Sequence, residues 1–210
     1  MGAEMALSAT DAVVPAASAE KGLIESCRRG DPQAFARLVA LHEGMVFNLA
    51  ARLLGDPEEA RDLAQDVFLQ VYRTLGRFQG RSSLKTWIYR IVVNQCRNRQ
   101  RWWRRRQRSR SCPIDDLTPS DEAKLAGSDE PGDGPFERVR RREQSERVQK
   151  ALLELSFDHR AILLLREVEN LSCEEVAGTL GLPEGTVKSR LARAREALRQ
   201  RLMPYVKELP

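Results

Sequence analysis

Apolar residues recur every three or four positions along the whole stretch from Pro57 to Leu75. They are Ala60, Leu63, Ala64, Val67, Phe68, Val71, Tyr72 and Leu75. This spacing puts them on one side of an α-helix, and that side has to be buried against other elements. Helical spacing is frequent in the rest of the chain beyond residue 20, whereas the apolar–polar alternation of strands is missing. The sequence therefore predicts an all-α fold.

Capping and turn residues mark where the first helices begin and end. Asp31 precedes Pro32, a pair typical of a helix N-cap followed by the first helical position. Gly55 is suited to end that helix, and Asp56 to cap the next one. Glu59, three residues after Asp56, is placed to complete a capping box. These signals predict two consecutive helices joined by a tight turn.

The composition changes abruptly between Cys112 and Pro135, where prolines, glycines and acidic residues replace the helical pattern. Such a segment is typical of a flexible acidic linker. We therefore expect two small helical domains, which a chain of 210 residues is long enough to form. The expected parts are a disordered tail at 1–20, a first helical domain at 21–111, the linker at 112–135 and a C-terminal domain at 136–210.

The helix from Pro57 to Leu75 carries a second stripe that faces outward. It consists of Asp62, Gln65, Asp66 and Leu69. A single exposed leucine is ordinary on a protein surface. Beside two carboxylates at helical spacing, however, this leucine favours a protein-binding face.

All charged residues between Asp66 and Asp115 are basic, although the formal net charge of the chain is only +5. A dense positive stretch attracts a polyanion. Nucleic acid is the first candidate partner, and an anionic membrane surface is the second.

Within this basic stretch a helix is expected from about Thr86, with Trp87 and Ile88 on its buried side. Its other side carries Arg90, Asn94, Arg97, Asn98 and Arg101. Basic and amide side chains on one helical stripe are able to read bases and to hold phosphates. A plain solvated basic face is the alternative.

The C-terminal part contains two helices joined by a tight turn. Ser172 and Glu175 have capping-box spacing, Gly181 suits a left-handed turn, and Val187 is expected to hold the second helix against the first. This pattern predicts a helix-turn-helix, whose second helix enters the DNA major groove. The open face of that helix carries Thr186, Lys188, Ser189, Ala192, Arg193 and Glu196, while Arg190, Arg195 and Arg199 are better placed for phosphates or for the bundle surface. A plain helical hairpin is the alternative.

The sequence offers no arrangement of residues that would carry catalysis. Its cysteines are scattered without a C-x-x-C pair, and its histidines are His42 and His159. We therefore expect no metal, no cofactor, no small-molecule substrate and no enzymatic activity. Free cysteines indicate a reducing cytoplasm. Neither a signal peptide nor an apolar run of membrane-spanning length is present, so membrane insertion is not expected.

Three segments resemble, in the same order, the extracytoplasmic-function class of bacterial sigma factors. The polymerase-binding segment of that class is similar to Asp56–Leu69, DPEEARDLAQDVFL. Its segment that reads and melts the minus-ten promoter element resembles FQGRSSLKTWIYRIVVNQCRN, and its minus-thirty-five reader is similar to LSCEEVAGTLGLPEGTVKSRLARAREAL. The resemblance covers about Asp31 to Leu202 apart from the linker.

This resemblance implies a factor that binds core RNA polymerase, recognises both promoter elements and promotes DNA melting. It assigns the stripe of Asp62, Gln65, Asp66 and Leu69 to docking on the polymerase clamp helices. It also implies that polymerase performs all catalysis, that the linker runs through polymerase, and that an inhibitory anti-sigma factor is a partner.

The resemblance also assigns DNA contacts by position. The loop that would take up a flipped base contains Gln79, Gly80, Arg81, Ser82, Ser83 and Lys85. Asn94 lies where the class contacts the minus-ten strand. Lys188, Ser189 and Arg193 occupy the minus-thirty-five reading positions.

Two other functions stay open on the sequence. An ordinary helix-turn-helix repressor or activator would bind duplex DNA by itself, which leaves the outward stripe from Asp62 to Leu69 unexplained. An RNA-binding protein is supported only by the arginine tract from Arg97 to Arg110. Trp102 and Trp103 within this tract are able either to stack on unpaired bases or to pack at the domain edge. Co-purification with core polymerase separates the three functions.

Overall fold

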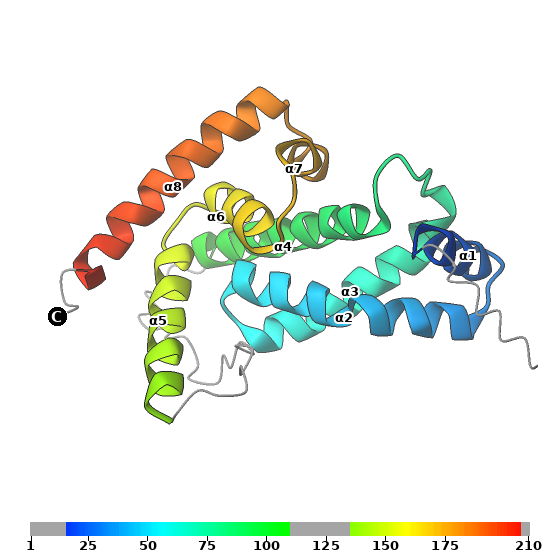
Figure 1. The fold of residues 1–210 in the computed structure, drawn as a ribbon, viewed down its shortest axis with the longest axis horizontal. Coiled ribbons are helices and arrows are strands. Elements are labelled where there is room, and N and C mark those ends of the chain that lie inside the picture. The colour runs from blue at the N-terminus through cyan, green and yellow to red at the C-terminus, as the bar shows by residue number, and fades with distance from the viewer. Residues whose placement is uncertain (1–15, 110–134, 207–210) are drawn as a thin grey trace, which may run out of the picture. The chain divides into compact units, whose positions relative to one another are not determined.

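The computed structural model describes residues 16–109 and 135–206, and within these residues the chain forms helices and turns without a strand. The N-terminal helices are α1 (Ala16–Arg28), α2 (Pro32–Leu54), α3 (Pro57–Thr74), the short 3-10 helix η1 (Leu75–Arg77) and α4 (Leu84–Ser109). The C-terminal helices are α5 (Pro135–Leu153), α6 (Phe157–Leu163), the π-helical turn η2 (Leu164–Val168), α7 (Cys173–Leu180) and α8 (Glu184–Val206). Figure 1 shows this order. The predicted all-α class is confirmed, and the predicted linker lies outside the described residues except for Pro135.

The chain divides into two compact units, one ending at Leu41 and the other beginning at His42, within α2. In the first unit some apolar side chains of α1 and of the start of α2 are buried, among them Ile24 and Leu38. Asp31 caps α2, because its carboxylate accepts hydrogen bonds from the backbone N–H groups of Gln33 at 2.9 Å and Ala34 at 3.3 Å. The predicted cap is therefore confirmed.

The second unit contains the long core that α2, α3 and α4 share. Its buried side chains include Val46, Leu49, Leu53, Ala60, Leu63, Val67, Phe68, Val71, Leu75, Ile88, Val92 and Cys96. The repeat predicted for α3 is largely confirmed, but Ala64 is only half-buried and Tyr72 is 60% exposed. Tyr72 follows Val71 directly, and neighbouring residues of a helix point about 100° apart. The buried side of α3 is therefore narrower than the repeat suggests.

The turn between α2 and α3 matches the sequence signals only in part. Gly55 has a φ of +80°, which a residue with a Cβ rarely adopts. Asp56 caps α3 by accepting hydrogen bonds from the backbone N–H groups of Glu58 at 2.9 Å and Glu59 at 3.2 Å. The carboxylate of Glu59 turns to Arg99 of α4, whose Nη1 lies 3.0 Å from its Oε2. Glu59 therefore links α3 to α4 where the sequence predicts a capping box.

Candidate functional site

The outward stripe predicted on α3 is present on the surface. Asp62, Gln65, Asp66 and Leu69 are all exposed, and Leu69 is 53% exposed. Oδ2 of Asp66 lies 3.4 Å from Nη2 of Arg99, so one arginine on α4 faces both Asp66 and Glu59. Tyr72 extends the stripe by one further turn from Leu69, and its exposure marks it as a residue that the sequence reasoning missed.

The loop between η1 and α4 is held at both of its ends. The rings of Phe78 and Trp87 pack with their centroids 5.3 Å apart, and Phe78 is buried. Ser83 caps α4, since its hydroxyl accepts a hydrogen bond of 3.1 Å from the backbone N–H of Thr86. Between these anchors the predicted loop residues are exposed, namely Gln79, Gly80, Arg81, Ser82 and Ser83. The chain thus presents a short polar loop on a fixed base.

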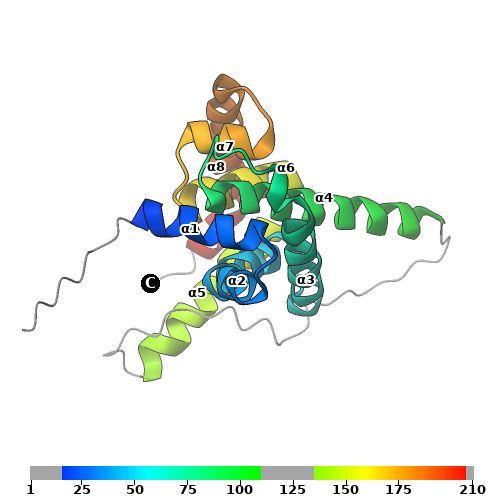
Figure 2. The same ribbon diagram turned by 90° about the vertical axis from the view of Figure 1, so that its right-hand side faces the viewer.

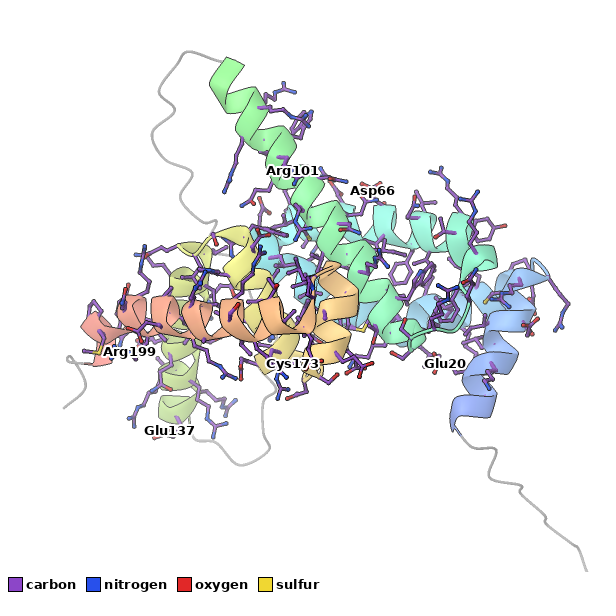
Figure 3. The ribbon with its side chains drawn as sticks, turned by 90° about the horizontal axis from the view of Figure 1, so that it is seen from above. Glu20, Asp66, Arg101, Glu137, Cys173 and Arg199 are labelled. Atoms are coloured by element: carbon purple, nitrogen blue, oxygen red, sulfur yellow. The ribbon has the colours of Figure 1, made fainter. Side chains whose placement is uncertain are left out.

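The predicted basic stripe of α4 is mostly open to solvent. Arg90, Asn94, Asn98 and Arg101 are exposed. Arg97 is half-buried, because Nη2 contacts Asp158 Oδ1 at 3.2 Å and the guanidinium carbon lies 5.4 Å from the centre of the Phe157 ring. Lys85 is exposed and places its Nζ 5.5 Å from the centre of the Tyr89 ring. Figure 3 shows Arg101 on the part of α4 that continues beyond its neighbouring helices.

The opposite side of α4 is buried against C-terminal helices. The hydroxyl of Tyr89, which is fully buried, donates a hydrogen bond to Glu169. Thr86 donates to Oε1 of Glu175 at 3.4 Å. Burial, followed by the hydrogen bond from its hydroxyl to Glu169, raises the pKa of Tyr89 above its ordinary value. These contacts join residues about 80–90 positions apart, which explains why no local pattern indicated them.

The helix-turn-helix forms from α7 and α8 as the capping signals predict. The hydroxyl of Ser172 accepts from the backbone N–H of Glu175 at 3.1 Å, and Oε2 of Glu175 accepts from the backbone N–H of Ser172 at 2.9 Å. Gly181 ends α7 with a φ of +67°, in the left-handed region. Val187 is fully buried, which holds α8 on its neighbours. Figure 2 shows α7 and the start of α8 joined by this turn.

The open face of α8 carries the residues that the sequence singled out. Lys188, Ser189, Ala192 and Arg193 are exposed, and Thr186 and Arg190 are half-buried. Nζ of Lys188 lies 2.7 Å from Oε1 of Glu184, one helical turn away, and this hydrogen bond raises the pKa of Lys188. The hydroxyl of Ser189 donates to the carbonyl oxygen of Thr186 at 3.0 Å.

Two arginines of α8 that the sequence favoured for phosphates already have carboxylate partners. Arg195 contacts Glu167 at 2.6 Å, and Arg199 contacts Glu196 at 2.8 Å. The hydrogen bond from Arg199 lowers the pKa of Glu196 to about 2. Both pairs are exposed, so water and salt weaken them. Arg193 is exposed on the open face, whereas Arg195 and Arg199 each contact a carboxylate.

The described residues contain no group of His, Cys, Asp and Glu side chains suited to a metal ion. In the same part of the chain, no helix is both long enough and apolar enough to cross a membrane.

Comparisons with known proteins match the same two parts of the chain. Residues 38–109 match the family model described as Sigma-70 region 2, and residues 145–198 match the one described as Sigma-70, region 4. The RNA polymerase sigma-H factor of Pseudomonas aeruginosa is 37% identical over 191 residues, which cover 90% of this chain and 96% of that protein. The ECF RNA polymerase sigma factor SigW of Bacillus subtilis is 32% identical, over 87% of this chain and 96% of that protein.

Two solved structures are similar over most of their length. CnrH, solved in complex with the cytosolic domain of CnrY, has a TM-score of 0.62 and 26% identity, and the match covers 89% of this chain and 98% of that chain. The sigma factor RpoE of Bartonella quintana, solved with the anti-sigma factor NepR, has a TM-score of 0.60 and 27% identity, with 80% and 96% covered.

Proposed function

Because the chain belongs to the sigma-70 family and to its extracytoplasmic-function class, it recognises promoters and initiates transcription through RNA polymerase, and we propose which of its residues do so. The observation that carries the proposal is the exposed basic and amide stripe of α4, whose opposite side is buried. A helix anchored in this way presents its polar stripe to a partner in a fixed orientation.

We assign polymerase docking to the stripe of Asp62, Gln65, Asp66 and Leu69 on α3. An exposed leucine flanked by carboxylates combines an apolar contact with charge complementarity to a basic partner surface. α3 and α4 pack against each other through buried side chains, so docking through α3 also positions the DNA-facing stripe of α4.

We assign minus-ten recognition to the loop and to the stripe of α4. The residues are Gln79, Gly80, Arg81, Ser82, Ser83, Lys85, Arg90, Asn94, Arg97, Asn98 and Arg101. Separating a base step costs a few kcal/mol. Capture of a flipped base by the loop offsets that cost, because it is possible only with a separated strand, and phosphate contacts along α4 add to the binding. This part of the chain thereby stabilises melted DNA.

We assign minus-thirty-five recognition to the open face of α8. In a helix-turn-helix the second helix lies in the major groove. The residues that we assign to this contact on α8 are Thr186, Lys188, Ser189, Arg190, Ala192 and Arg193. Arginine is suited to a bidentate contact with guanine, and the methyl group of alanine to the thymine methyl group. Lys188 first has to leave Glu184 if it is to reach DNA.

We also propose the domain boundaries of the chain, its partners and its cellular location. We propose a polymerase- and minus-ten-binding domain at 21–111, an acidic tether at 112–135 and a minus-thirty-five-binding domain at 136–210, all acting in the cytoplasm. Catalysis belongs to polymerase, and the chain itself takes no cofactor. An anti-sigma factor is a further partner, which is supported by the similarity to RpoE, whose structure was solved in complex with the anti-sigma factor NepR.

The test begins with the transcripts that core polymerase starts when the full chain is added, because they define a promoter. Asn94→Ala is then expected to bind core polymerase normally and to initiate poorly on that promoter. A template with a preformed bubble at the minus-ten element should restore initiation, since melting is no longer required. Wild-type initiation by Asn94→Ala and by Arg101→Ala on the closed promoter would contradict the assignment of α4.

A further inference from the structure

We propose that Trp102 and Trp103, at the distal end of α4, form a stacking platform for an unpaired base of the DNA strand that the α4 stripe holds. This inference rests on the strand contact proposed above. It adds to that contact a second site, at the distal end of α4.

Both indole rings are exposed to solvent. Trp102 is 43% exposed and Trp103 is 41% exposed, although indole rings are usually well covered in folded proteins. Their ring centroids lie 5.0 Å apart at an interplanar angle of 78°, so the rings touch edge to face. The sequence left open whether these rings pack at the domain edge or stay available to bases. Their exposure favours availability.

Trp102 continues the row of residues on α4 that we assign to the DNA strand. Arg90, Asn94, Asn98 and Trp102 follow one another at intervals of four residues, so each lies beside the next along a row that winds gradually around α4. Trp102 stands one interval beyond Asn98, which is a rise of about 6 Å along the axis. A strand that follows the stripe beyond Asn98 would therefore reach Trp102 next.

The two indoles lie among positively charged side chains. Arg101, Arg104, Arg105 and Arg106 surround the two indoles and are exposed. The guanidinium carbon of Arg106 lies 5.0 Å from the centre of the Trp102 ring. Aromatic rings set among cations are the arrangement that binds single-stranded nucleic acid, because bases stack on the rings while the cations hold phosphates. Figures 2 and 3 agree that this part of α4 extends beyond its neighbouring helices.

The experiment measures DNA binding by the full chain reconstituted with core RNA polymerase. The probes are a fluorescently labelled single-stranded oligonucleotide of mixed sequence and the duplex of the same sequence. The double variant Trp102→Ala/Trp103→Ala is compared with Trp102→Phe/Trp103→Phe, which keeps rings of smaller size. Arg104→Gln/Arg105→Gln is the matched charge variant, because it keeps both indoles and removes two cations.

We expect the alanine variant to bind the single strand at least about five-fold more weakly, since stacking on an aromatic ring contributes about 1–3 kcal/mol per base. Its duplex affinity and the salt dependence of its binding should stay as in wild type, and the phenylalanine variant should recover most of the loss. The charge variant should instead weaken both probes and flatten the salt dependence, because fewer counterions are released.

Wild-type single-strand binding by the alanine variant, or an equal loss on the duplex, would overturn the stacking platform. Wild-type complex that binds the single strand no better than core polymerase alone would overturn the strand contact of α4 itself. The two failures are therefore distinguished by the wild-type measurement.

Discussion

Nε of Arg160 donates a hydrogen bond of 3.0 Å to the carbonyl oxygen of Leu152. The terminal nitrogens of the same guanidinium donate to the carbonyl oxygens of Leu53, Leu153 and Leu155. Arg160 is buried, and burial lowers its pKa to about 10, so it stays protonated at neutral pH. One arginine of α6 thus satisfies backbone carbonyls at the end of α2 and at the turn between α5 and α6.

Arg160→Met is therefore expected to lower the free energy of unfolding by about 3 kcal/mol or more, because each buried carbonyl left without a donor costs about 1–3 kcal/mol. Urea unfolding followed by circular dichroism measures the change. Arg193→Met is the matched control, since the exposed Arg193 should change stability by less than about 0.5 kcal/mol. Equal effects of the two substitutions would show that Arg160 is no more than a surface arginine.

Two glycines of the helix-turn-helix should respond to alanine in opposite directions. Gly181 has a φ of +67°, and a Cβ there would meet no atom within 4 Å, so backbone strain alone should destabilise Gly181→Ala by about 1–2 kcal/mol. Gly178 lies inside α7, where a Cβ also meets nothing within 4 Å, and Gly178→Ala should stabilise by about 0.5–1 kcal/mol. Thermal melts of the two variants test this. A gain in stability for Gly181→Ala would contradict the left-handed turn.

The capping box of α7 should make stability depend on acid. The backbone N–H of Ser172 donates to Glu175 and, as the largest cause, lowers the pKa of that carboxyl below 4.5. A lowered pKa in the folded state means that the stabilisation is fully present above pH 4.5 and is lost as the pH falls below it towards the folded-state pKa. Glu175→Gln should remove this part of the pH dependence. Urea midpoints above and below pH 4.5 measure it, and parallel curves for wild type and variant would refute the assignment.

Features that depend on neighbouring residues were predictable from the sequence. Asp31, Asp56 and Ser172 each cap a helix as expected, because a cap needs only the N–H groups two or three residues ahead. The exposure of the α3 stripe and of most residues in the α4 and α8 stripes was predictable for a similar reason, since helical period alone separates a buried side from an open one.

Features that depend on distant residues were not predictable. Arg160 and Leu53 are separated by 107 positions, and the contact between Arg99 and Asp66 joins two helices. Glu59 had the spacing of a capping box, yet the guanidinium of Arg99 offers its carboxylate a charged partner. Tyr72 fitted the apolar repeat but lies at the edge of the buried side, whose width is set by the helices packed on it.

Polymerase docking through α3 can be tested without disturbing the ion pair of Asp66. Asp66→Arg would place a second guanidinium beside Arg99, so loss of binding by that variant would mix two effects. Leu69→Asp avoids this problem and should weaken core binding at least about ten-fold, because a central apolar contact is replaced by a charge. Leu41→Asp is the control, since Leu41 is 64% exposed and lies outside the stripe. A pull-down with core polymerase gives the result, and retained binding by a folded Leu69→Asp would remove α3 from the interface.

Substitution of Arg193 on the open face of α8 distinguishes base reading from phosphate contact. Arg193→Ala should weaken initiation by about 1–3 kcal/mol at promoters that need the upstream element, and preference should change at particular bases. A uniform loss across promoter variants would make Arg193 a phosphate contact instead.

Glu184→Gln tests the same face of α8 through an expected gain in DNA affinity. Lys188 is held by Glu184 at 2.7 Å, so the neutral amide should release its ammonium group for DNA. We expect the variant to bind promoter DNA more tightly and with a steeper salt dependence, because one more cation is available and one fewer anion opposes the phosphates. Glu174→Gln is the control, since Glu174 is also exposed but lies on α7. Filter binding of the reconstituted polymerase complex at several salt concentrations measures both quantities. Unchanged affinity for Glu184→Gln, or an equal gain for Glu174→Gln, would show that the ion pair of Lys188 does not limit DNA binding.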